Sequence, residues 1–350
     1  MKVMVTGSDG YIGSVLVPFL LEKGFDVAGM DTGYYALGQL GCSSPCPVKV
    51  KDIRHVEPAD VTGFDAVVHL AELSNDPLGH LSPELTYQIN LKGSVRLARL
   101  CREAGVKRFL HSSSTSVYGI ASSAPCTETS PVHPQSEYAR CKWLTEQALE
   151  ELAAPGFSPV ILRNATAFGP SPNMRFDLVL NNLAGLAWTR GEIAMTSDGT
   201  PWRPMVHVMD ISRAVATALL APVERIHNQI FNVGDDRQNH QVRELAAIVA
   251  AVFPGCRVTT GPASGDNRSY RVDFSKIAGQ LGFRCRNSVE DGARQLREMF
   301  TCVGLTPAAF SMTPFTRLHQ IESLIRSGKL DAELFWRTPA VAPRSEAATV

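Results

Sequence analysis

The chain has 350 residues, of which 44% are hydrophobic and 19% are charged, the balance of a folded globular protein. Lys and Arg together number 34, as do Asp and Glu, so the formal net charge is zero, and we expect neither a nucleic-acid partner nor an anionic membrane surface. No apolar run reaches the ~18 residues that a membrane span needs, a strand follows Met1 at once, and the eight cysteines lack metal-type spacing. The sequence therefore predicts a cytoplasmic protein with reduced thiols, no signal peptide and no bound metal.

Strands alternate with helices along the first half of the chain. Hydrophobic periodicity predicts strands at 2–6, 26–30, 48–51, 66–70, 108–112 and 159–163, and helices at 11–23, 83–104 and 137–152. This alternation implies right-handed crossovers and a parallel sheet covered by helices on both faces. We therefore predict an α/β fold with a doubly wound Rossmann sheet over residues 1–168, an architecture that binds dinucleotides at the carboxyl ends of its strands.

The second half has shorter elements. Helices are predicted at 176–190, 211–221 and 242–253, and a strand at 229–233. We interpret residues 169–300 as a smaller C-terminal α/β substrate domain, of which about 205–235 packs back on the first sheet. Residues 301–350 are predicted to be a C-terminal extension with a helix near 316–326 and a disordered last dozen residues.

A glycine-rich turn follows the first predicted strand. Gly7 permits a tight turn, Gly10 lets the backbone approach a pyrophosphate, and Gly13 lets the helix pack close to the strand. The N-terminus of the following helix presents free N–H groups and a positive dipole end to phosphates. A glycine pattern alone is weak evidence, but this one lies between a strand and an amphipathic helix, as a dinucleotide site requires.

A carboxylate follows the second predicted strand, 18 residues after the last glycine of the turn. Asp31 at this place is able to accept hydrogen bonds from the adenosine ribose and to repel the extra phosphate of NADP, which favours NAD. We therefore predict that residues 1–168 form an NAD-binding Rossmann domain. Asp52 and Ile53 follow the third strand and are expected beside the adenine.

Tyr138 and Lys142 form a YxxxK element at the start of a predicted helix. The i,i+4 spacing puts the phenol and the ammonium on one helical face. The ammonium favours loss of the phenolic proton, so Tyr138 is a candidate general acid and base. Such pairs often occur by chance, but Ser114 follows a central strand and is expected beside the nicotinamide, where it is able to bond a substrate oxygen.

Taken together, these motifs resemble the extended short-chain dehydrogenase/reductase superfamily, in its nucleotide-sugar epimerase/dehydratase branch, over roughly residues 1–300. The resemblance rests on Gly7-x-x-Gly10-x-x-Gly13, Asp31, Asp52, His69-Leu70-Ala71, Asn90, Ser114-Thr115-Ser116-Val117-Tyr118-Gly119, Tyr138-x-x-x-Lys142, Leu162-Arg163, Gly169-Pro170, Asn181-Asn182-Leu183, Arg203, His207-Val208 and Asp210.

The resemblance implies a role for each matching residue. The catalytic set is Ser114, Tyr138 and Lys142. The NAD-binding set is Gly7, Gly10, Tyr11, Ile12, Gly13, Asp31, Asp52, Ile53, Leu70, Ala71, Asn90, Ser112, Tyr138 and Lys142. The substrate set is Ser114, Ser116, Thr166, Asn182 and Arg203, to which we add Arg268 as a second cation outside the usual family spacing. The resemblance further implies a nucleotide-diphosphate sugar as substrate and a homodimer through about 83–104 and 137–152.

The residue at position 116 separates the reactions of this branch. The resemblance places Thr-Asp-Glu at 114–116 in the 4,6-dehydratases, Glu at 116 in the decarboxylases and Cys at 116 in the 3,5-epimerases. Ser116 suits none of these reactions, which leaves hydride transfer alone, and so C4 epimerisation through a transient 4-keto sugar. A ketoreductase, dehydrogenase or dehydratase of the same superfamily, and a non-catalytic NAD-binding regulatory protein, remain as alternatives.

Three residues depart from the family pattern. Glu72 follows His69-Leu70-Ala71 where many relatives have small residues, and His80 lies further along the same segment. Both are structural residues or extra acid/base groups, and the sequence leaves this open. Thr166 stands where many relatives have Asn, so its sugar contacts are undetermined.

Overall fold

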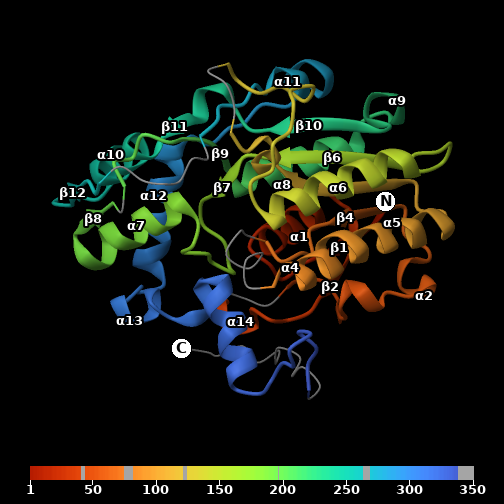
Figure 1. The fold of residues 1–350 in the computed structure, drawn as a ribbon, viewed down its shortest axis with the longest axis horizontal. Coiled ribbons are helices and arrows are strands. Elements are labelled where there is room, and N and C mark those ends of the chain that lie inside the picture. Colours follow the sequence, from red (N-terminus) through yellow and green to blue (C-terminus); the bar gives the residue numbers. More distant parts are fainter. Residues whose placement is uncertain (41–43, 75–81, 121–123, 196, 263–268, 338–350) are drawn as a thin grey trace.

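The computed structural model describes all residues except 41–43, 75–81, 121–123, 196, 263–268 and 338–350. A seven-stranded sheet in the order β10-β6-β5-β4-β1-β2-β3 forms its centre, and all neighbouring strands are parallel (Figure 1). The strands are β1 (Lys2–Thr6), β2 (Asp26–Asp31), β3 (Val48–Val50), β4 (Ala66–His69), β5 (Arg108–Ser114), β6 (Ser158–Asn164) and β10 (Gln229–Val233). The prediction of a doubly wound Rossmann sheet is confirmed.

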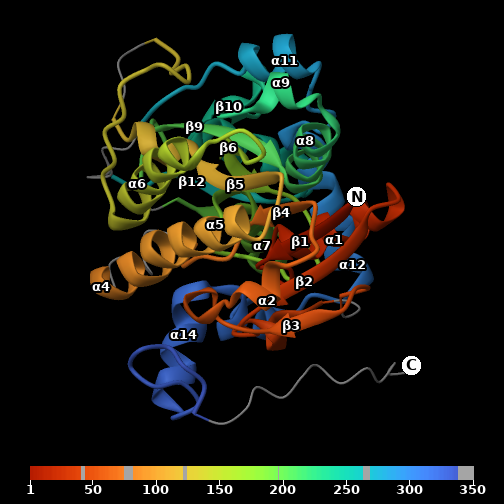
Figure 2. The same cartoon turned by 90° about the vertical axis from the view of Figure 1, so that its right-hand side faces the viewer.

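Helices cover both faces of this sheet. On one side lie α1 (Gly13–Glu22) and α8 (Val208–Leu220), and on the other lie α5 (Ser94–Glu103) and α6 (Glu137–Leu152) (Figure 2). Successive residues of β1 face opposite helix layers: Val3 and Val5 belong to the same core as Leu16 of α1, whereas Met4 belongs to the same core as Leu97 of α5. Because successive side chains of a strand point to opposite faces, an apolar strand needs a helix on each side.

The helix predicted at 83–104 is not continuous. It consists of α4 (Pro83–Thr86), a π-helical segment at Tyr87–Gly93 and α5. Such wide turns are rare and occur mostly near functional sites. Asn90 lies within the π-helical segment and is buried.

The second half of the chain forms two small sheets beside the main one. One has the order β11-β9-β7 and the other pairs β12 with β8. The strands are β7 (Thr166–Phe168), β8 (Glu192–Ala194), β9 (Trp202–His207), β11 (Asn239–Gln241) and β12 (Arg257–Thr259), and three helices, α7 (Val179–Arg190), α10 (Val242–Val252) and α12 (Val289–Cys302), pack with them in a second core. The sequence predicted α7 and α10 but none of these five strands and not α12.

The chain returns to the main sheet after leaving it. β10 pairs with β6, and α8 packs on α1, so residues within 205–235 extend the first sheet and one of its covering layers. The remaining short helices are α2 (Pro58–Val61), α9 (Val223–Ile226), α11 (Ser275–Leu281) and α13 (Pro307–Phe310), together with single 3-10 turns at Ala36–Gly38, Ile53–His55, Thr115–Tyr118, Asp236–Gln238 and Thr313–Phe315.

The C-terminal extension is part of the folded body up to Arg337. The helix predicted at 316–326 is α14 (Arg317–Arg326), which lies beyond the β2–β3 end of the sheet (Figure 2). Its Ile321 and Leu324 belong to the same core as Met30 of β2. The predicted disorder of the last dozen residues falls outside the described part of the chain. Within that part, no helix combines the length and the apolar character that crossing a membrane requires.

Candidate active site

One cavity of about 1060 Å³ lies at the carboxyl ends of the central strands. In open parallel sheets, ligands bind at this edge. The volume exceeds the upper end of the range for a single small-molecule site, roughly 300–1,000 Å³. The cavity therefore has room for a dinucleotide and a second ligand beside it.

The glycine turn forms the floor of one end of the cavity. Gly7 has φ +73°, and a Cβ on it would lie 2.9 Å from the backbone N of Ala71. A Cβ on Gly13 would lie 2.2 Å from the carbonyl oxygen of Gly7. Both positions therefore need glycine, and the turn brings the backbone and the first residues of α1 to the cavity. This cradle fits the phosphates of a dinucleotide.

Asp31 ends β2 and lines the same cavity. Its carboxylate accepts hydrogen bonds from the backbone amides of Asp9, at 3.1 Å, and Gly33, at 2.8 Å. Burial raises the pKa of Asp31, and the two amides act in the opposite direction. Burial and the charge of Asp31 together raise the pKa of Asp9 to about 6. Asp31 is thus held in one orientation at the place predicted for the adenosine ribose.

Ser114, Tyr138 and Lys142 line the same cavity, where the sequence predicts the nicotinamide. Ser114 is the last residue of β5, and Tyr138 and Lys142 lie one turn apart at the start of α6. The Lys142 ammonium is 5.6 Å from the centroid of the Tyr138 ring and donates a hydrogen bond to the carbonyl of Ser112. The three side chains therefore share one wall of the cavity.

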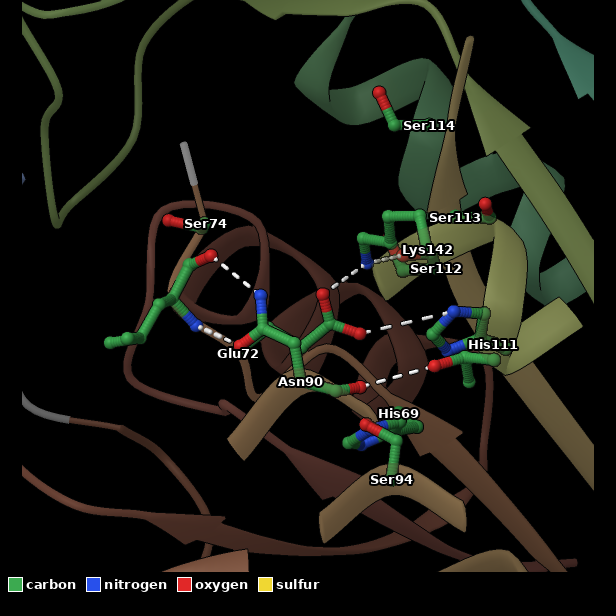
Figure 3. Close-up of polar contacts among 12 residues, drawn as sticks. His69, Glu72, Ser74, Asn90, Ser94, His111, Ser112, Ser113, Ser114 and Lys142 are labelled. Carbon is green, nitrogen blue, oxygen red and sulfur yellow. Dashed lines mark hydrogen bonds and ion pairs between the residues drawn. The ribbon is translucent and has the colours of Figure 1, made fainter. Parts of the chain in front are cut away.

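Glu72 lies directly behind this set. Its carboxylate is 2.7 Å from the Lys142 ammonium, and the two side chains are 2% and 5% exposed (Figure 3). Burial raises the pKa of Glu72 to about 7, against the influence of Lys142. The sequence left the role of Glu72 open. The one sign of a role for Glu72 in the sequence is that a carboxylate follows a buried strand, at a place where small residues are usual.

The residues predicted to bind the cofactor occupy the cavity wall, with one exception. The lining includes Gly7, Gly10, Tyr11, Ile12, Gly13, Asp31, Asp52, Ile53, Leu70, Ala71, Ser112, Tyr138 and Lys142. Asn90 is not part of it: its side-chain amide bonds both the N–H and the carbonyl of Leu73, at 2.9 Å each. Asn90 thus fixes the segment that carries Glu72.

Most of the residues predicted to bind the substrate also line the cavity. Ser114, Ser116, Thr166, Asn182 and Arg203 line the cavity. The amide of Asn182 donates to the carbonyl of Phe176, at 2.9 Å, and the guanidinium of Arg203 donates to the carbonyl of Trp202, at 2.9 Å. Arg268 and His80 lie outside the described residues.

The lining also includes residues that the sequence did not predict, among them Arg175, Tyr270 and Arg317. Arg175 is paired with Asp177, at 2.9 Å. Arg317 comes from α14 and lies 4.0 Å above the ring of Tyr35. No local motif marks a cation that reaches the site from the far end of the chain, so Arg317 was not accessible to pattern analysis.

The family model of the NAD dependent epimerase/dehydratase family matches residues 3–234. The chain belongs to this family, whose cofactor is NAD, and its resemblance to the extended short-chain dehydrogenase/reductases is confirmed. The glycine cradle and Asp31 fit that cofactor.

The relatives that the chain resembles catalyse different reactions. It is 28% identical over 321 residues to the UDP-glucose 4-epimerase of Mycolicibacterium smegmatis, across 86% of this chain and 98% of the relative. The structure of MoeE5 in complex with UDP-glucose and NAD is 27% identical, with a TM-score of 0.76 over 87% of this chain and 100% of that chain. TunA, an NAD-dependent NDP-hexosamine 5,6-dehydratase, has a TM-score of 0.77 at 24% identity, over 86% of this chain and 98% of that chain, which shows a shared fold. The chain is thus an NAD-dependent enzyme of the epimerase/dehydratase type.

Proposed function

We propose that this protein is a nucleotide-sugar 4-epimerase. In this proposal Ser114 bonds the C4 oxygen of the sugar and Tyr138 takes the proton of the C4 hydroxyl as the C4 hydride leaves. Bound NAD supplies the reversible hydride acceptor. The 4-keto sugar then rotates so that the opposite face of C4 is presented to the cofactor. Tyr138 returns the proton to the C4 oxygen as the hydride comes back to C4, so no net oxidation occurs. Lys142 favours the phenolate form of Tyr138 that accepts the proton.

The observation that carries this proposal is the state of the carboxylates in the cavity. Dehydration and decarboxylation need a free acid or base beside the sugar. Each carboxylate of the described lining is already engaged, by two backbone amides or by a cation: Asp31 with Asp9 and Gly33, Asp52 with Arg54, Glu72 with Lys142, and Asp177 with Arg175. The same lining has no cysteine, and position 116 carries a serine. These described lining residues support a reaction that needs only hydride and proton transfer at C4.

Glu72 needs separate consideration because it is the carboxylate nearest to the predicted chemistry. Both of its oxygens are shielded from solvent. A sugar in the cavity therefore meets Lys142 and Tyr138 rather than the Glu72 carboxylate. This arrangement argues against Glu72 as a dehydratase acid.

The substrate handle is proposed to be a nucleoside diphosphate. A diphosphate needs cations or amide donors, and Arg203 and Asn182 supply these groups in the cavity wall. The similarity to MoeE5, which was solved with UDP-glucose, supports a handle of this kind. We also propose a homodimer through the surface formed by about 83–104 and 137–152, which a sedimentation measurement tests.

The experiment is incubation with UDP-, dTDP-, GDP- and CDP-sugars, followed by analysis of the released sugar. We expect one panel member to yield its C4 epimer with no net change in NADH. Tyr138→Phe should lower the rate by about 10²–10⁴-fold while the cofactor stays bound, since it removes only the proton donor and acceptor. Tyr87→Phe, outside the cavity, is the matched control and should keep the wild-type rate.

Other results favour the alternatives. Reduction of a 4-keto sugar by added NADH, with every other panel member unchanged, identifies a single-pass reductase. A product that has lost water identifies a dehydratase. Retention of NAD with no turnover on any sugar, in wild type and Tyr138→Phe alike, identifies a non-catalytic NAD-binding protein.

A further inference from the structure

Glu72 is a buried ionisable group to which the proposed chemistry gives no task. It comes three positions after the end of β4, and Asn90 holds the segment that carries it. Its carboxylate oxygen Oε2 is 2.7 Å from Lys142 Nζ (Figure 3). Because its oxygens are shielded from solvent, the interaction with Lys142 is weakly screened.

The nearest imidazoles supply no second charge. His111 Nε2 is 3.8 Å from Glu72 Oε1, and the His111 ring stacks on His69 with centroids 5.6 Å apart. Burial, followed by the charge of Lys142, lowers the pKa of His69 to about 3 and holds the pKa of His111 well below its usual range. Both rings are therefore neutral near pH 7, and Lys142 is the cation that faces Glu72.

The same three side chains, His69, Glu72 and His111, come close enough to hold a metal ion. Two observations argue against that use. Both ring nitrogens of His69 are engaged at 2.7 Å, with the hydroxyls of Thr6 and Ser94. The carboxylate of Glu72 already faces an ammonium, which would repel a second cation. The buried carboxylate of Glu72 is therefore better explained as the partner of the Lys142 ammonium than as a metal ligand.

The Lys142 ammonium has two polar contacts within the described part of the chain. It donates a hydrogen bond to the carbonyl of Ser112 at the end of β5, and it forms an ion pair with Glu72 Oε2. Burial disfavours the charge of Lys142, but the carboxylate of Glu72 and other negative groups outweigh it and raise its pKa. The ammonium is thus charged and fixed between β5 and α6, with the Tyr138 ring 5.6 Å away.

We propose that Glu72 is a positioning residue of this site: its carboxylate fixes the Lys142 ammonium and offsets its charge, which limits how strongly Lys142 favours the phenolate of Tyr138. Glu72 acts through Lys142 and does not touch the sugar. The proposal rests on the proposed role of Tyr138 in proton transfer, but not on the identity of the substrate.

The other charges around this pair are compensated. Glu146, one turn further along α6, is paired with Arg163 of β6 at 2.6 Å. Arg175, whose charge reaches Tyr138, is paired with Asp177. Burial raises the pKa of Cys141 to about 12, so this thiol stays neutral. Removal of the Glu72 charge is therefore the one change, among these described groups, that leaves Lys142 uncompensated.

The test is a titration of the tyrosinate absorbance in the holoenzyme, which needs no sugar. Subtraction of the Tyr138→Phe titration isolates Tyr138. Burial raises the pKa of Tyr35 and of Tyr118 to about 12 and that of Tyr11 and Tyr34 further, so these residues do not interfere near neutral pH. In Glu72→Gln the uncompensated ammonium should move the Tyr138 midpoint down by about one pH unit. The acid limb of the pH–rate profile should move with it.

The control is Glu150→Gln, which removes an exposed carboxylate from the same helix and should leave the midpoint unchanged. Glu72→Asp should move it in the same direction as Glu72→Gln but by less, since its shorter side chain holds the charge farther from Lys142. This second variant decides the question if Glu72→Gln does not fold. An unchanged midpoint, or one that rises, overturns the proposal. Because the absorbance titration measures no turnover, its result is independent of whether the protein proves to be an epimerase.

Discussion

At the scale of single residues, close approach of the backbone explains the glycine turn. The carbonyl of Gly7 lies where a Cβ of Gly13 would be, and the backbone of Ala71 lies close to where a Cβ of Gly7 would be. Strand, turn and helix α1 are therefore packed without room for a methyl group. The predicted phosphate-binding turn at Gly7–Gly13 therefore needs glycine for close packing of the backbone rather than for conformational flexibility.

Gly13→Ala should consequently destabilise the protein by about 1–3 kcal/mol, the usual cost of overpacking, and weaken NAD binding. Denaturant unfolding and a calorimetric titration with NAD measure the two effects. Gly279→Ala in α11 is the matched control, because a Cβ there would meet nothing within 4 Å. It should be neutral or stabilise the helix by about 0.5–1 kcal/mol. Equal behaviour of the two variants would contradict the close-packed turn.

The sequence predicted the site residues that belong to a local motif. It did not predict the role of site residues that lie outside any motif. Asp31, Ser114 and the Tyr138–Lys142 pair each follow a strand or begin a helix, so their place in a parallel sheet follows from the sequence, and all line the cavity. Glu72 became interpretable only when its partner was known, since that partner is 70 positions away and on another element. What each of these residues does in turnover is still a prediction.

At the scale of elements, a buried ion pair holds α6 against the sheet. Arg163 of β6 and Glu146 of α6 are 4% and 2% exposed. Arg163 also donates to the Tyr118 hydroxyl, at 3.0 Å, and Tyr118 donates to Asn232 of β10, at 2.7 Å. This network ties three neighbouring elements to the helix that carries Tyr138 and Lys142.

Loss of one partner should therefore be costly. Glu146→Gln leaves the Arg163 guanidinium buried without its counter-charge, and we expect a loss of about 3–5 kcal/mol in the free energy of unfolding. Glu290→Gln on α12 is the matched control, because the side chains of Glu290 and its partner Arg294 are each 55% exposed. This variant should change the free energy of unfolding by less than about 0.5 kcal/mol. Denaturant unfolding of both variants checks the contrast, and similar losses would argue against a structural role for the buried pair.

The long elements of the main sheet were predictable, whereas the small sheets were not. Five-residue strands and amphipathic helices carry a period that is visible in the sequence. β7, β8, β11 and β12 have three residues each, which is too short for a period, and β3 is equally short and was predicted only because it falls in the strand–helix alternation. β9 has six residues but carries Pro204 inside its run, which argues against a strand in the sequence. The π-helical segment at Tyr87–Gly93 was hidden because its composition is that of an ordinary helix.

At the scale of the whole molecule, the C-terminal segment packs beside the end of the cavity where the adenosine of NAD is predicted. Trp336 Nε1 donates to the carbonyl of Thr32, at 2.8 Å, and the Tyr34 hydroxyl donates to the carbonyl of Leu334. Gln320 of α14 donates to the carbonyl of Tyr34, at 3.0 Å, and Arg317 lines the cavity itself. Residues 317–336 therefore meet residues 32–34 beside the cavity, a long-range contact that no periodicity in the sequence reveals.

A chain that ends at Phe315 should accordingly bind NAD at least roughly tenfold more weakly than the full chain. A chain that ends at Arg337 retains every one of these contacts and should bind like the full chain. Trp336→Ala, a single change in the same segment, should weaken binding by a smaller factor. Equal affinity of all four proteins in a calorimetric titration would show that the segment does not contribute to the site.

In the proposed mechanism the hydride leaves C4 of the sugar and returns to the same carbon. This is tested with a nucleotide sugar deuterated at C4, using the panel member that turns over. We predict a mixture of both C4 epimers in which the deuterium remains at C4 and no NADH accumulates. Accumulation of reduced cofactor, loss of water from the product, or transfer of the deuterium to a carbon other than C4 would contradict it.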